Sequence, residues 1–99
     1  VRVVNERPEA ETSWFGVPTV CEDNNLKRSL VAYLEENKIQ TRNYFAGNIL
    51  LHPGYRDLGK ASDYPNANQV LDKVFFLGCS PTINEKMLQY IEKVVSNFQ

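Results

Sequence analysis

The stretch Val74-Phe75-Phe76-Leu77-Gly78-Cys79, together with the amphipathic segment that follows it, decides the fold of this 99-residue chain. An unbroken apolar run of this length is typical of a strand covered on both faces, so we expect residues 74–79 to be central in a sheet. Residues 82–98 then repeat apolar side chains at helical spacing. Thr82 and Glu85 have the spacing of a capping box, which predicts where this last helix begins.

The first half of the chain predicts a strand and then a helix. Residues 13–21 are rich in β-branched and aromatic side chains, which favours a strand. Pro18 predicts an edge position or a bulge, because proline cannot donate to a ladder. Between residues 26 and 34 the apolar side chains recur at helical spacing, while Lys27 and other charged residues face away from them. Asn37 suits the left-handed residue that ends many helices.

The middle of the chain predicts a third strand and short helical pieces. Residues 39–45 have the composition of a strand that runs into a turn. Pro53-Gly54 interrupts the next apolar stretch, so at most a short helix fits before it. Asn66 and Gln69 resemble a capping box, which predicts a short helix that ends at Asp72.

These elements predict an α+β fold. Short strands and two amphipathic helices bury their apolar faces only when both helices stack on one side of the sheet. We therefore expect a two-layer sandwich with a small, mostly antiparallel sheet and helices packed on one face. Residues 13–99 are expected to form this single domain, and the polar, acid-rich residues 1–12 are expected to be a linker or an N-terminal arm.

Composition excludes several kinds of partner. A net charge of −1 leaves no basic field for nucleic acid, and the candidate strands lack interleaved basic and aromatic residues. No apolar run approaches the ~18 residues of a membrane span. Cys21 and Cys79 lie far apart and His52 is the only histidine, so no metal site is expected. Neither a nucleic acid nor a membrane is an expected partner.

The densest cluster of polar side chains runs from Thr41 to Asn48. Arg42 offers a planar fork of donors that suits a carboxylate or a pyrophosphate. Gly47 lets the backbone approach a ligand, and Asn48 could orient a sugar hydroxyl or a keto oxygen. A plainer alternative is that Arg42 pairs with a surface acid and that Gly47-Asn48 is only a turn. His52 has no visible partner for acid–base chemistry, so a structural role is favoured for it.

Three stretches resemble one protein family closely: Ser13-Trp14-Phe15-Gly16, the block from Thr41-Arg42 to Phe45-Ala46-Gly47-Asn48, and Val74–Gly78 with Pro81 and the last helix. They are similar to the C-terminal small domain of the DegT/DnrJ/EryC1/StrS sugar aminotransferase and dehydratase family, which are vitamin-B6-dependent enzymes of fold type I. The Phe-Ala-Gly-Asn motif is the most specific part. The branch it resembles most is CDP-4-keto-6-deoxy-D-glucose 3-dehydrase of lipopolysaccharide and dideoxysugar biosynthesis.

The resemblance implies a parent enzyme in which pyridoxamine phosphate forms a Schiff base with a nucleotide-linked 4-keto-6-deoxy sugar and drives loss of its C3 hydroxyl. In that branch a histidine replaces the usual Schiff-base lysine, and an iron–sulfur reductase supplies electrons. The cofactor, pyridoxamine or pyridoxal phosphate, would be bound mainly by a large domain of the same polypeptide. The chain starts at Val1 without methionine and without a secretory signal, so we expect it to be an excised piece. The resemblance implies that the parent enzyme is a cytoplasmic homodimer. No catalytic residue and no cofactor site is expected within the piece itself.

The resemblance also implies that this small domain closes over the active site with the Arg42 to Asn48 block facing the substrate. Arg42 would bind an anionic or hydroxyl group of the nucleotide sugar, and Asn48 would bind sugar hydroxyls. Phe45 and Gly47 would shape the wall of the site, and Tyr44 would support that wall from behind.

Two alternatives remain open from the sequence. His52, a further supporting residue, stands where relatives often have glutamine before the proline, which leaves the exact substrate open. A nucleotide-sugar aminotransferase that keeps its lysine could carry much the same small domain. From a different class, a stand-alone α+β binding or interaction module would also fit, provided that it has a self-contained pocket.

Overall fold

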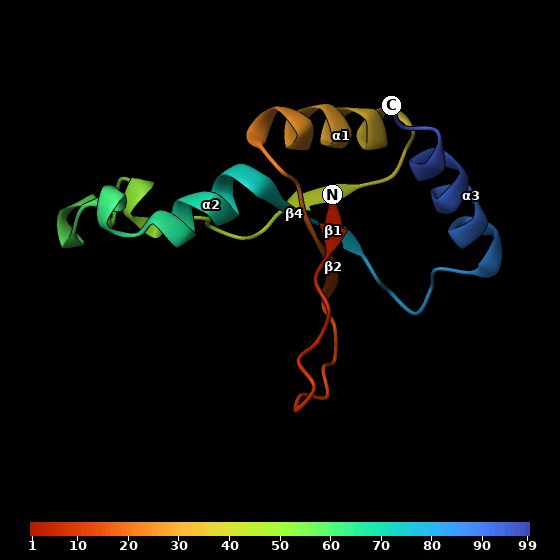
Figure 1. Cartoon of the computed structure of the whole chain (residues 1–99), viewed down its shortest axis with the longest axis horizontal. Helices are drawn as coiled ribbons and strands as arrows, with labels where there is room; N and C mark the ends of the chain where they lie inside the picture. Colours follow the sequence, from red (N-terminus) through yellow and green to blue (C-terminus); the bar gives the residue numbers. More distant parts are fainter.

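The computed structural model describes residues 1–99 as four strands and three α-helices in an α+β arrangement (Figure 1). The strands are β1 (Arg2–Val3), β2 (Gly16–Val20), β3 (Thr41–Asn43) and β4 (Val74–Gly78), and the helices are α1 (Asn24–Glu36), α2 (Pro65–Lys73) and α3 (Glu85–Ser96). Every strand pair is antiparallel, in the order β1-β2-β4-β3. The predicted α+β class with an antiparallel sheet is therefore confirmed.

Strand β4 is central, as predicted, but only one of its faces is covered by helices. Phe75 points to the helical side and is 1% exposed. Phe76 lies opposite Arg42 of β3, and directly opposed residues share a face of the sheet. Phe76 is only half-buried, under other aromatic side chains. The expectation that both faces of β4 are covered is wrong, because no helix lies over the Phe76 face.

The core lies between the sheet and the two long helices. Leu30 and Leu34 of α1 and Val94 of α3 are buried in one cluster with Phe75. The Tyr33 hydroxyl also donates to the backbone oxygen of Val94 at 3.0 Å, which ties α1 to α3. Both helices therefore bury their apolar faces on the same side of the sheet, as a two-layer sandwich requires.

Helix α3 begins at a different cap from the one predicted. The side chain of Asn84 accepts a hydrogen bond from the backbone N–H of Met87 at 3.0 Å, so Asn84 is the N-cap and Glu85 is the first helical residue. Thr82 instead forms a short turn with Ser80, whose hydroxyl lies 2.9 Å from the Thr82 hydroxyl. The Thr82–Glu85 capping box is wrong because a stronger cap stands immediately before the helix.

Helix α2 starts two residues earlier than predicted, with Tyr64 and not Asn66 at the N-cap position. Pro65 occupies its first turn, where the missing N–H of proline is not needed, and Asn66 lies inside the helix and does not cap it. The helix continues to Lys73 and passes directly into β4 at Val74. The predicted capping box at Asn66 is wrong because the fixed backbone of proline already defines the helix start.

Lys27 is buried, although the periodicity places it on the solvent side of α1. Its ammonium group donates to the backbone oxygen of Leu71 at 2.7 Å, and Asn24 donates to the backbone oxygen of Asp72 at 2.9 Å. Both acceptors belong to the end of α2, where helical carbonyls lack partners. Burial lowers the pKa of Lys27, and the nearby Asp72 opposes this shift. The start of α1 thus caps the end of α2.

The structure also differs from two expectations about the backbone, at the end of α1 and at Pro18. Asn37 is the C-cap of α1 with φ −88°, and the left-handed position belongs to Lys38, with φ 62°. Strand β2 lies between β1 and β4, so it is not an edge strand over its whole length. The Pro18 oxygen accepts from the Val4 N–H at 3.0 Å. The Pro18 nitrogen therefore faces the β1 side just past the end of β1, where no donor is needed.

The molecule has long projections around a small core (Figure 1). Residues 4–15 form an extended hairpin below the sheet, and residues 49–73, with 3-10 turns at Ile49–Leu51, Arg56–Leu58 and Ala61–Asp63, form a lateral limb. The radius of gyration is 15.4 Å, against about 13 Å for a compact domain of this length. The accessible surface is 7734 Å², against about 5,800 Å² for a compact protein of this mass. No helix is both long and apolar enough to cross a membrane.

Candidate functional site

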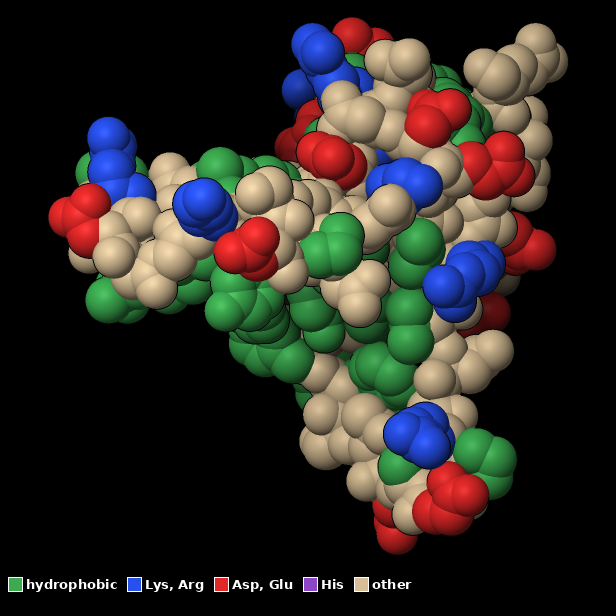
Figure 2. Space-filling model, turned by 60° about the vertical axis from the view of Figure 1, so that its left-hand side comes forward, with side chains coloured by type: hydrophobic (Ala, Val, Ile, Leu, Met, Phe, Trp, Pro, Cys, Tyr) green, Lys and Arg blue, Asp and Glu red, His purple; other side chains and the backbone are tan.

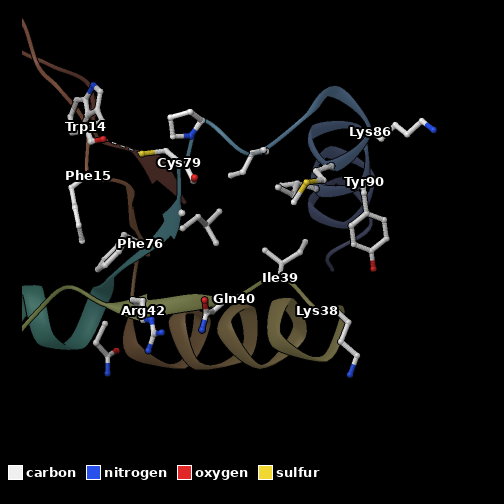
Figure 3. Close-up of a pocket in the computed structure, with 18 of the residues that line it drawn as sticks. Trp14, Phe15, Lys38, Ile39, Gln40, Arg42, Phe76, Cys79, Lys86 and Tyr90 are labelled. Carbon is white, nitrogen blue, oxygen red and sulfur yellow. Dashed lines mark hydrogen bonds between the residues drawn. The ribbon is translucent and has the colours of Figure 1, made fainter.

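An open groove of about 1060 Å³ lies between the edge of the sheet and helix α3. Eleven of its 19 lining residues are hydrophobic, so its walls are mainly apolar. Figure 3 shows two ends: Trp14, Phe15 and Phe76 gather on one side, and Ile39 and Tyr90 lie on the other, next to α3. We call these the aromatic end and the α3 end of the groove.

The cations of the groove lie at its rim, and the side chains of Lys38 and Lys86 extend away from its centre (Figure 3). The groove lining includes the three cations Lys38, Arg42 and Lys86 and no aspartate or glutamate. The chain as a whole has 12 acidic and 11 basic residues, so this selection is local and does not follow from composition. A cleft lined by one sign of charge attracts ligands or partner surfaces of the opposite sign.

The aromatic end is a wall of three phenylalanine rings on the sheet face that no helix covers. The ring centroids of Phe15 and Phe76 are 5.8 Å apart, those of Phe45 and Phe76 are 5.9 Å apart, and those of Phe15 and Phe45 are 6.1 Å apart. Gly16 makes room for this wall, because a Cβ atom there would collide with the Phe76 ring. Phe15 is 76% exposed and Phe45 is 69% exposed. Figure 2 shows hydrophobic side chains gathered in the angle between the lateral limb and the N-terminal hairpin.

Three of the predicted site residues come together at this end. Arg42 and Phe45 both line the groove. Tyr44 contacts Phe45 and Phe76, with ring centroids 5.6 Å and 6.2 Å away. Arg42 lies beside Phe76 on the exposed sheet face. Their predicted contact with a substrate stays a prediction, but they share one surface.

Asn48 lies outside the groove. It is 2% exposed, and its amide donates to the backbone oxygen of Ala61 at 3.1 Å and to the side-chain oxygen of Asn68 at 2.8 Å. Its own side-chain oxygen accepts from the Leu50 N–H at 3.1 Å. Both amide hydrogens of Asn48 are used, so no donor remains for a sugar. We therefore leave Asn48 out of the substrate surface and treat it as a residue that fixes the turn.

Gly47 and His52 also serve the turn and not the groove. Gly47 has φ 63°, and a Cβ atom there would meet the Cβ of Leu71 at 2.7 Å. The need for glycine thus comes from packing against α2, not from the approach of a ligand. His52 is exposed, with its Nε2 atom 3.2 Å from the backbone oxygen of Ala46. Phe45 itself has φ 48°, so the turn must hold a residue in an unfavourable conformation.

Several groove residues were not singled out from the sequence. Phe15 and Phe76 were interpreted only as strand residues and as parts of the family motifs, and no role was predicted for Lys38 or Lys86. The antiparallel register is the signal that could have found Phe76, because it places that ring opposite Arg42. Cys79 also lines the groove, with its thiol 3.2 Å from the backbone oxygen of Trp14. Cys21 is buried instead, and burial raises the pKa of its thiol.

The fold and the groove together define a small α+β domain with an uncovered aromatic and cationic face. The profile of the DegT/DnrJ/EryC1/StrS aminotransferase family matches residues 1–96, and the chain belongs to this family. It is 34% identical over 95 residues to dTDP-4-dehydro-2,6-dideoxy-D-glucose 3-dehydratase of Saccharopolyspora spinosa, covering 92% of this chain and 21% of that protein. It is 36% identical over 105 residues to lipopolysaccharide biosynthesis protein RfbH of Salmonella typhimurium, covering 95% of this chain and 23% of that protein.

These similarities confirm the family that the sequence motifs indicated. They also show how much of these proteins the chain matches, because it spans less than a quarter of the length of either curated relative. The small, antiparallel α+β architecture agrees with a small domain of this family.

Proposed function

We propose that this chain is the small domain of a vitamin-B6-dependent nucleotide-sugar 3-dehydratase in dideoxysugar or lipopolysaccharide biosynthesis. The family membership and the names of the two relatives support the reaction class. The observation that carries the role of this chain is the aromatic end of the groove, where Phe15, Phe45 and Phe76 stand beside Arg42 on an uncovered sheet face. In the proposed enzyme this face is one wall of the substrate site.

The chemistry of that wall suits a nucleotide-linked 4-keto-6-deoxy sugar. Aromatic faces stack on pyrimidine bases and on the apolar faces of sugar rings. The guanidinium group of Arg42 presents paired donors whose geometry matches a pyrophosphate. It is exposed and engaged in none of the side-chain hydrogen bonds of β3, which run between Thr41 and Glu35. No carboxylate lines the groove, and the carboxylate of Glu35, which lies near Arg42, accepts hydrogen bonds from Thr41.

The residues of this chain do not fit the vitamin-B6 cofactor itself. Such a cofactor supplies an electron sink to its substrate, and its protein site needs a Schiff-base lysine or a substitute and a partner for the ring nitrogen. The groove contains Lys38 and Lys86 but no carboxylate that could pair with the ring nitrogen. Lys27 is buried and donates to the backbone oxygen of Leu71. We propose that the cofactor is held by a large domain in another part of the polypeptide.

The remaining parts of the proposal follow from the family resemblance. Residues 13–99 act as one small domain that closes over the active site, and residues 1–12 form an N-terminal arm that adds strand β1 to its sheet. The parent enzyme is a cytoplasmic homodimer that receives electrons from an iron–sulfur reductase. If the parent instead retains a Schiff-base lysine, the same wall serves a nucleotide-sugar aminotransferase, and the released product distinguishes the two reactions.

The proposal is tested by replacing Arg42 with glutamine in the full-length enzyme. Loss of a charge-assisted contact to the nucleotide should raise KM about tenfold or more, with a smaller change in kcat. Arg28→Gln is the matched control, because Arg28 is an exposed arginine of α1 outside the groove. Dehydration of the sugar nucleotide is followed by mass spectrometry. Equal KM values for the two variants and the wild type would remove Arg42 from the site.

A further inference from the structure

We propose that the α3 end of the groove binds an amphipathic helix from another part of the same polypeptide, with carboxylates beside its apolar stripe. The inference rests on the proposal that this chain is one part of a longer family enzyme, but not on the identity of the substrate. It concerns the surface formed by the exposed side chains of Met87 and Tyr90 and the partly buried Leu77 and Ile91, with the buried core residue Ile39 at its base.

Helix α3 has an apolar stripe that the chain covers only in part. Val94 is 5% exposed, but Met87 is 47% exposed and Tyr90 is 46% exposed. Apolar side chains at helical spacing pack best against the ridges of a second helix. The 12 residues of α3 span about 18 Å, so a partner helix of about three turns matches its length.

The charges around this end select the chemistry of the partner. Lys38 follows α1, and Lys86 lies in the first turn of α3, so cations border the apolar surface from two elements. No carboxylate of this chain lines the groove to balance them. A helix with aspartate or glutamate beside its apolar stripe would therefore cover the apolar surface and pair with the lysines that border it. The same groove of a second copy would bring like charges together, which disfavours a symmetric dimer through this surface.

The chain leaves more surface uncovered than a compact domain does, and the groove shares this excess with the N-terminal hairpin and the lateral limb (Figure 1). The chain exposes 7734 Å², which is about 1,900 Å² more than a compact protein of its mass. A standard protein–protein interface buries only about 800 Å² on each partner. A helix of the same polypeptide is present at an effective concentration of about millimolar, so it can cover this surface without high intrinsic affinity.

A small ligand fits the α3 end less well than a helix does. Ligand sites are usually clefts of about 300 to 1,000 Å³ with a few convergent polar groups. The α3 end is open, and the side chains of Ile39, Leu77 and Ile91 offer no hydrogen bonds. The polar and aromatic groups that suit a nucleotide gather instead at the aromatic end (Figure 3).

The test compares two neighbouring cysteines in the full-length enzyme, with Cys79→Ser as background and no substrate present. Met87→Cys places a thiol in the groove, and Leu88→Cys places one on the same helix outside it, at a site of similar exposure in this chain, 47% against 52%. A partner helix should slow maleimide labelling of the Met87→Cys thiol about tenfold or more relative to the Leu88→Cys thiol. Equal labelling rates would overturn the proposal.

Two further measurements identify the occupant. A photo-crosslinker attached at Met87→Cys should trap a peptide of the same polypeptide that contains carboxylates at helical spacing. A mixture of 15N-labelled and unlabelled enzyme shows whether that peptide comes from the same copy, and capture from a second copy would contradict the proposal. Protection that appears only when cytidine diphosphate is added would assign the groove to the ligand and would also overturn it. None of these readouts depends on catalysis, so a failure here is distinct from a failure of the Arg42 test.

Discussion

At the scale of single residues, the backbone and the neighbours of Gly47 leave no room for any other side chain. Replacing it with alanine should destabilise the 99-residue chain by about 2 to 4 kcal/mol, because the residue is left-handed and its new methyl group meets Leu71. Gly54→Ala is the control, since a Cβ atom at Gly54 has no neighbour within 4 Å. The change there should stay within about 0.5 kcal/mol. Urea unfolding of both variants measures the difference, and equal midpoints would contradict the packing argument.

The residues of the site could be predicted only in part from the sequence. The cluster from Arg42 to Phe45 was recognisable because it combines a donor fork with aromatic rings on a short stretch. The role of Asn48 could not be deduced, since an amide that serves a buried network and one that binds a sugar have the same sequence signal. Lys27 was misplaced for a related reason, because its buried acceptor lies 44 residues away on another helix.

At the scale of elements, one carboxylate joins α1 to β3. A side-chain oxygen of Glu35 accepts from the backbone N–H of Thr41 at 2.6 Å and from the Thr41 hydroxyl at 2.7 Å. These bonds, backbone first, hold the pKa of Glu35 below its ordinary value of 4.5, and nearby Arg42 adds to the shift. The corner between helix and strand therefore depends on the charged form of Glu35.

This bond predicts a pH dependence of stability. Because the folded-state pKa of Glu35 is lowered, its contribution is complete above pH 4.5 and is lost as the pH falls toward the folded-state value. Glu35→Gln should therefore make the unfolding free energy fall less steeply below that pH than it does in the wild type. The adjacent exposed residue provides the control, and Glu36→Gln should keep the wild-type slope. Urea titrations at a series of pH values would detect the difference; identical slopes for all three proteins would exclude the role of Glu35.

The type of each main element was predictable, but the ends of the elements were not. Apolar periodicity identified α1, α3 and the central strand, because burial of one face imposes that pattern. The caps of α2 and α3 were wrong, since several cap-forming residues stand near each start and local contacts select among them. Strand β3 ends earlier than predicted because the chain turns at Phe45, which has φ 48°.

At the scale of the whole molecule, the sequence shows which residues are apolar but not which of them remain uncovered. The large exposed hydrophobic side chains on the open sheet face and on α3 have the same periodicity as core residues. Only the three-dimensional arrangement shows that the rest of these 99 residues does not cover them. Relatives more than four times as long are consistent with that arrangement.

The uncovered aromatic wall gives a prediction for the chain as a whole. Phe15→Ser should reduce the fluorescence of a bound hydrophobic dye such as ANS by about half, because Phe15 belongs to a contiguous apolar cluster. Leu58→Ser is a matched control, since Leu58 is 77% exposed against 76% for Phe15 but lies on the lateral limb away from the rings. A larger loss of fluorescence in Leu58→Ser than in Phe15→Ser would show that the dye binds elsewhere.

The direct passage from α2 into β4 has a consequence for how this family can vary in length. One residue inserted between Lys73 and Val74 would either rotate α2 by about 100° about its axis or move Phe75 to the opposite side of the sheet. Neither change preserves both the hydrogen bond from Lys27 to the end of α2 and the packing of Phe75 in the core. Length differences among homologues are therefore expected in the exposed turns around residues 52–60, where the chain meets few neighbours.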